Sequence, residues 1–145
     1  MIIAVAAVLI AVGYFSVLRL NQKMRDTKRM NDIVSVQRAM ALLKKDAGTY
    51  LSACGLTPYS GSVSGCVGDN QNFKLNEYLS GLSEANDPSL STDLCQPSCP
   101  IRPCNYNFTE ISKDAYKIFF YLEAGVEDFG AGCYLLTETG VKAGN

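Results

Sequence analysis

The chain opens with eighteen residues, MIIAVAAVLIAVGYFSVL, that carry no charge, and Arg19 then begins a basic stretch. An apolar run of this length can enter a bilayer or pack against copies of itself. We expect one long helix over residues 1–50, apolar in its first part and basic in its second. Residues 1–18 are predicted to be a transmembrane segment or a surface that packs against copies of the chain, and residues 19–50 a stalk that packs on a head formed by residues 51–145.

The flanks of this run do not fit a cleaved signal peptide, because Met1 starts directly in the apolar segment and no cut site follows Leu18. If the run is a membrane anchor, the charges that follow it conflict with the cysteines of the head. The positive-inside rule would hold residues 19–45 in the cytoplasm, on the same side as a cysteine-rich head. One resolution is that a short basic leader precedes this sequence in the native protein, which would make Met1 an internal methionine.

Apolar residues recur along the stalk at the spacing of a narrow helical stripe. We expect this stripe to pack against the head; its members are Ile33, Val36, Met40 and Leu43. Gly48 and Thr49 are predicted to end the helix.

Charge is unevenly distributed along the chain. Residues 1–45 hold eight Lys/Arg and two Asp, a net +6, whereas residues 46–145 hold five Lys/Arg and twelve Asp/Glu, a net −7. Such asymmetry could bring the head of one copy against the stalk of another. Nucleic acid is the competing partner, but Asp26 and Asp32 interrupt the basic stretch and no binding motif accompanies it.

An even number of cysteines in a small head predicts up to three disulfides and an oxidising surrounding. The six are Cys54, Cys66, Cys95, Cys99, Cys104 and Cys133. Connectivity stays open, although Cys54 with Cys66 is the most local pairing and Cys133 would then tie the last strand to the 95–104 loop. A zinc site is the rival interpretation, but the spacing lacks the paired CxxC pattern and the chain has no histidine.

The absence of histidine also excludes a CxxCH haem attachment and any Ser-His or Cys-His catalytic pair. No arrangement of Asp and Glu stands out as an acid-base pair. We therefore expect neither an enzyme nor a cofactor or metal.

The head is predicted to be α+β. Residues 52–72 form an irregular loop, a two-turn helix covers 75–82, and strands at 106–108, 115–124 and 133–138 make a small antiparallel sheet of three to four strands covered by the helical stripe. Asn107-Phe108-Thr109 fits the glycosylation sequon, as an isolated and weak match.

Three stretches carry a resemblance to a known family. RDTKRMNDIVSVQRAMALLKKDAGTY at 25–50 resembles the helix of many type IV pilins and type II secretion pseudopilins, and FKLNEYLSGLSEANDP and the terminal GCYLLTETG are similar to later parts of these subunits. The family begins its mature chain with a methylated Phe and a nearby glutamate after a basic leader. None of these precedes Met1, so the resemblance implies that the native protein has a few more residues at its start.

The resemblance implies the type IV pilin fold and a structural subunit of a pilus or pilus-like extracellular filament. The subunit would be held in the membrane with an extracytoplasmic head, then polymerised with itself at the cell surface by pilus assembly machinery. Nucleic acid would be a partner only of an uptake pilus. Filament-core packing is expected from Ile2, Ile3, Val5, Val8, Leu9, Ile10, Val12 and Phe15.

Three alternatives stay open. Within the same family, the chain could be a pseudopilin of a type II secretion or DNA-uptake system. In other classes, it could be a membrane-anchored monomeric binding protein or an exported enzyme.

Overall fold

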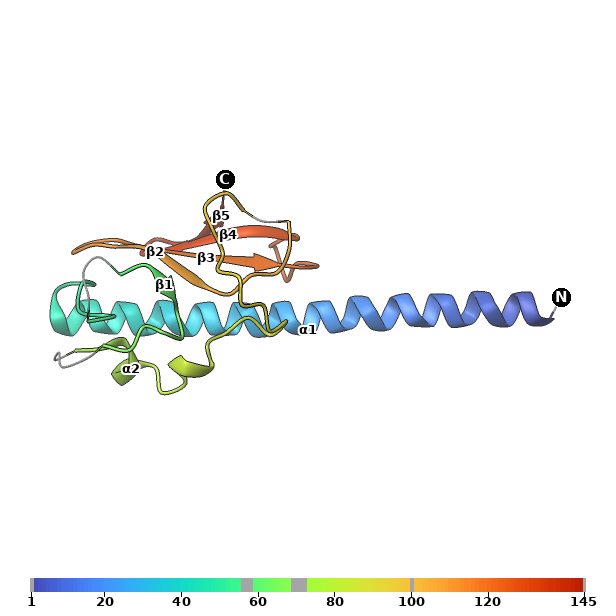
Figure 1. Cartoon of the computed structure of the whole chain (residues 1–145), viewed down its shortest axis with the longest axis horizontal. Coiled ribbons are helices and arrows are strands. Elements are labelled where there is room, and N and C mark those ends of the chain that lie inside the picture. The colour runs from blue at the N-terminus through green and yellow to red at the C-terminus, as the bar shows by residue number, and fades with distance from the viewer. Residues whose placement is uncertain (1, 56–58, 69–72, 100, 145) are drawn as a thin grey trace.

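A computed structural model describes residues 2–55, 59–68, 73–99 and 101–144, and within these the side chains of residues 2–9 and 11 are not described. One helix dominates the molecule: α1 runs over Ile2–Ala47, 46 residues, or about 69 Å at 1.5 Å per residue. The head lies along its second half, while its first half projects alone (Figure 1). Gly48 ends the helix with a φ of 71° and donates its N–H to Lys44 O at 2.9 Å, as expected for a glycine after the last helical turn.

The head is built on an antiparallel sheet with five strands among the described residues, not the three to four expected. Strand order follows the chain, β1-β2-β3-β4-β5. The strands are β1 Gly61–Ser62, β2 Asn107–Ile111, β3 Tyr116–Leu122, β4 Gly132–Thr137 and β5 Gly140–Ala143. The central strand β3 pairs with β4 without a shift of register from Ile118–Leu136 to Leu122–Gly132.

The predicted helix at 75–82 is shorter than expected and broken. The structure has α2 at Leu75–Tyr78 and a separate 3-10 turn, η1, at Leu82–Glu84. In Figure 1, α2 lies on the side of α1 away from the sheet. Leu75 and Leu82 are buried, so both short pieces still contribute to the core.

The main core lies between α1 and the sheet. The stripe residues Ile33, Val36, Met40 and Leu43 are all fully buried. Alternate residues of β3 join them in one cluster, namely Tyr116, Ile118, Phe120 and Leu122, as the period of two in a strand dictates.

The other face of the sheet carries a second, smaller cluster. Phe119, between the inward-facing residues of β3, is buried against Cys95 and Cys104, with Tyr121 and Leu135 partly buried beside them. The disulfide-rich loop that contains Cys95 and Cys104 therefore covers the sheet opposite α1, and the head has three layers: helix, sheet and loop.

Candidate assembly surface

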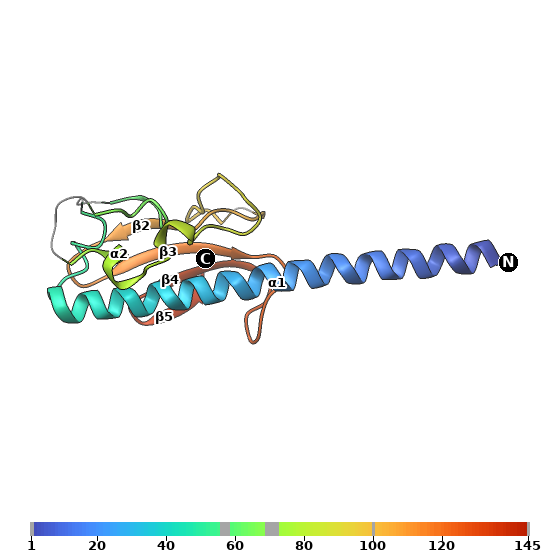
Figure 2. The same ribbon diagram turned by 90° about the horizontal axis from the view of Figure 1, so that it is seen from below.

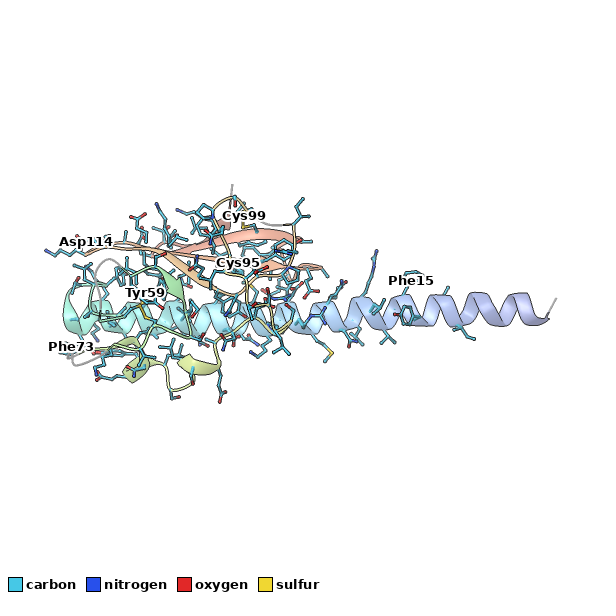
Figure 3. All side chains as sticks on the ribbon, viewed as in Figure 1. Phe15, Tyr59, Phe73, Cys95, Cys99 and Asp114 are labelled. Atoms are coloured by element: carbon cyan, nitrogen blue, oxygen red, sulfur yellow. A yellow bond between two sulfur atoms is a disulfide. The ribbon has the colours of Figure 1, made fainter. Side chains whose placement is uncertain are left out.

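The projecting half of α1 exposes large apolar side chains in a continuous series. Ile10 is 73% exposed and Phe15 66% exposed, and Figure 3 shows Phe15 on the bare helix, well away from the head. The other exposed members are Val12, Tyr14, Val17, Leu18, Leu20 and Met24. Monomeric proteins seldom leave a large contiguous apolar surface in water. We call this series, from Ile10 to Met24, the apolar neck.

Three of the predicted filament-core residues, Ile10, Val12 and Phe15, thus belong to the apolar neck. The side chains of the other five, Ile2, Ile3, Val5, Val8 and Leu9, lie outside the described set, although their backbone is helical. Among the described residues, no helix is both long and apolar enough to cross a membrane.

A buried cluster of charges fastens α1 to the head directly after the apolar neck. The Arg29 side chain is completely buried. Its Nη1 donates to Asp26 Oδ1 at 2.6 Å, its Nε and Nη2 donate to Asp87 at 2.6 and 3.0 Å, and Nη2 lies 2.7 Å from Glu123 Oε1. Arg25 donates to both oxygens of Glu123 at 2.7 and 2.6 Å. Five charges thereby join α1, the 85–95 segment and the end of β3.

Asp26 also accepts three hydrogen bonds from the backbone at the end of β3. The N–H groups of Glu123, Ala124 and Gly125 donate to its carboxylate at 2.9, 2.7 and 2.9 Å. Gly125 has a φ of 86°, and a Cβ there would lie 2.4 Å from Phe129 O, so a side chain cannot be accommodated without a shift. One carboxylate on α1 thus holds the turn that leaves β3.

The environment favours the charged forms of Arg29 and Glu123. Burial acts to lower the pKa of Arg29, but hydrogen bonds and charges from Asp87, Glu123 and Asp26 outweigh it and the pKa is raised. The pKa of Glu123 is lowered, first by the hydrogen bond from Arg25 and then by Arg29, against the opposing effect of burial. Removing Arg29 would leave buried carboxylates without their partner, and an uncompensated buried charge of this kind costs about 3–5 kcal/mol.

The sequence interpretation missed this cluster, although a signal was present. Positions 26 and 29 continue the 3-4 spacing of the buried stripe towards the N-terminus, ahead of Ile33. Their charge alone places Asp26 and Arg29 in the basic stretch that begins at Arg19. The spacing placed them on the face of α1 that meets the head.

The expectation of a freely available basic stalk is therefore corrected in part. Arg25 and Arg29 pair with the head of their own chain, and Lys44 lies 2.6 Å from Asp114 Oδ1. Arg19 and Lys23 are exposed, and the side chain of neither forms an ion pair or hydrogen bond with a described residue.

All six cysteines form disulfides, so none remains to bind zinc. Cys54 pairs with Cys66, Cys99 with Cys133, and Cys95 with Cys104. The local pairing and the tie from Cys133 to the 95–104 loop are as predicted. Figure 3 places Cys95 and Cys99 on the head, on the sheet side of α1.

The sequon is not an accessible modification site in the folded chain. Asn107 is 2% exposed, and its Nδ2 donates to Cys95 O at 2.7 Å. Glycosylation would have to remove this bond and expose the side chain.

Comparison of the chain with known proteins finds no matching family model, no similar curated protein and no similar solved structure.

Proposed function

We propose that the chain is a structural subunit of an extracellular filament of the type IV pilus kind, as the resemblance of its sequence implies. The observation that carries the proposal is the contrast between the two halves of α1. The half within the head is fixed by a buried stripe and a buried charge cluster, whereas the other half projects and exposes the apolar neck. A helix of this kind buries its apolar surface only against something outside its own chain.

In the proposed filament, that surface is buried against the same surface of neighbouring copies. Before assembly, the uncharged run at 1–18 is held in the membrane, a part of the proposal that rests on the sequence alone. Transfer of apolar side chains from lipid to a bundle of apolar helices exchanges one apolar environment for another and carries little hydrophobic penalty. Assembly machinery would supply the extraction.

Three disulfides in a head of this size support an extracytoplasmic position, because such bonds form and persist in oxidising spaces. They also suit a subunit that must stay folded outside the cell. Each disulfide lowers the conformational entropy of the unfolded chain. For a loop of roughly fifteen residues this raises the free energy of unfolding by about 3 kcal/mol.

The test is to shear fibres from the surface of cells that make the full chain and identify their main protein. We expect wild-type fibres and none from Phe15→Asp, because a carboxylate placed in an apolar helix bundle has no partner. Phe15→Leu is the matched control and should assemble. Solubilised Phe15→Asp subunits should retain the folded head, since Phe15 does not touch it. The absence of wild-type fibres, or normal assembly of Phe15→Asp, would contradict the proposal.

A further inference from the structure

Two unpaired positive charges lie on the apolar neck. Arg19 and Lys23 are exposed between Leu18, Leu20 and Met24, at the point where α1 leaves the head. The charged residues further along α1 that reach the head are already paired within the chain, as described above. Any partner that covers the neck therefore has to meet two cations as well as apolar side chains.

Two unpaired negative charges lie on the loop between β3 and β4. Backbone hydrogen bonds link Val126 and Phe129 in both directions at 2.8 and 3.0 Å, which puts Glu127 and Asp128 at the tip. The ring of Phe129 packs edge-on against Tyr134 at 5.4 Å and fixes the base of the loop. Both acidic side chains are exposed, and neither forms an ion pair with a described residue.

These two sets of charges lie close together in one chain but form no ion pair with each other among the described residues. Figure 2 shows the β3–β4 loop hanging beside α1 where the helix emerges from the head. Lys23, Glu127 and Asp128 line one surface hollow, and Arg19 lines another with Glu123. No ion pair joins Arg19 or Lys23 to the loop tip among the described residues, and Glu123 is already bound by Arg25 and Arg29.

We propose that the end of the apolar neck nearest the head, at Arg19 and Lys23, docks the β3–β4 loop of a second copy, with Glu127 and Asp128 against these two cations, while the rest of the neck packs on the necks of neighbouring copies. The inference rests on the proposed function and names the contact that fixes the register of neighbouring subunits. Charge complementarity favours a second copy of the chain over a partner that would bury either pair of charges without opposite charges facing it. A contact between two different patches is heterologous when each copy uses one patch toward each neighbour, and a heterologous contact that does not close generates an open helical filament.

The experiment reverses each patch in the full chain and measures the fibres sheared from cells. The variants are Arg19→Glu with Lys23→Glu, Glu127→Lys with Asp128→Lys, and all four together. Like charges facing each other across an interface cost several kcal/mol, so each double reversal should lower the fibre yield by roughly tenfold or more. The fourfold variant should recover most of the yield. Arg38→Glu is the control and should assemble normally, since Arg38 is an exposed cation elsewhere on α1 that forms no ion pair with any residue the structure describes.

A cross-linking measurement distinguishes contact between copies from contact within one chain. Lys23→Cys and Asp128→Cys are placed on separate chains made in the same cell, and oxidised fibres should yield a disulfide-linked dimer. Normal yield from both double reversals, or no dimer from intact fibres, would overturn the inference while leaving the proposed function standing. A third chain carries both substitutions, and a link that forms inside this double variant but not between the separate chains would also overturn the inference. If the wild-type chain makes no fibres, both proposals fail.

Discussion

Removal of the Asp26 carboxylate tests the attachment of α1 to the head. In Asp26→Ala, the buried N–H of Gly125 loses its acceptor, which costs about 1–3 kcal/mol. The N–H groups of Glu123 and Ala124 are only partly buried and fall at the lower end of that range. Arg29 loses one of three acidic partners as well. We expect the free energy of unfolding to fall by about 4 kcal/mol, within the range for breaking a buried ion pair.

The measurement is a urea unfolding curve of the full chain in mild detergent with its disulfides intact, followed by tyrosine circular dichroism. Asp93→Ala is the control, because Asp93 pairs with Arg102 on the surface, where both side chains are more than half exposed. That change should alter stability by less than about 1 kcal/mol. Amide hydrogen exchange at Glu123, Ala124 and Gly125 should accelerate in Asp26→Ala only. A loss below about 1 kcal/mol, or unchanged exchange at these amides, would refute the assigned role of Asp26.

Two further predictions concern the same region. Because the folded-state pKa of Glu123 is depressed below its ordinary 4.5, its contribution to stability is complete above that value and is lost as the pH falls through the folded pKa. Glu123→Gln should therefore flatten the acid limb of a stability–pH curve, and an unchanged limb would contradict the assignment. Gly125→Ala should destabilise the head by more than about 1 kcal/mol, because its positive φ and the 2.4 Å approach to Phe129 O exclude a methyl group. Equal or greater stability of this variant in urea would show that the turn relaxes freely.

The parts of the fold predicted from the sequence are those where a single period or a single residue type decides the outcome. The stripe from Ile33 to Leu43 and the end of α1 before Gly48 follow from helical spacing and glycine conformation. Strand β3 follows from its run of aromatic and β-branched residues. These signals are local, so no knowledge of the partner elements was needed.

The missed strands are short and are defined by the strands with which they pair. Strand β1 has only two residues, inside a Gly- and Ser-rich loop, and is a strand because Gly61 and Ser62 pair with β2. Strand β5 follows β4 after a two-residue connection and is defined by its pairing with Tyr134 to Thr137. Short polar strands lack a periodic signal of their own.

Of the candidate site, too, one part was predictable from the sequence and another was not. The exposed apolar half of α1 was predictable, because no charge interrupts residues 1–18 and a small head cannot cover so long a helix. The charge cluster was not predicted, since hydrophobic patterning assigns Asp26 and Arg29 to solvent. Only the positions of Asp87 and Glu123, 58 and 94 residues from Arg29 in sequence, make their burial tolerable.

The position of the charge cluster along α1 has a mechanical consequence for assembly. The cluster lies between the apolar neck and the hydrophobic stripe. The attachment of the head to α1 therefore begins directly after Met24. The cluster also holds, through Asp26, the turn that begins the acidic β3–β4 loop. In the proposed assembly, a force that draws the apolar half of α1 out of lipid would first reach the head through buried charge-assisted hydrogen bonds, which are stronger than neutral ones. The neck and the loop proposed to meet on neighbouring copies are therefore positioned by one and the same cluster within each copy.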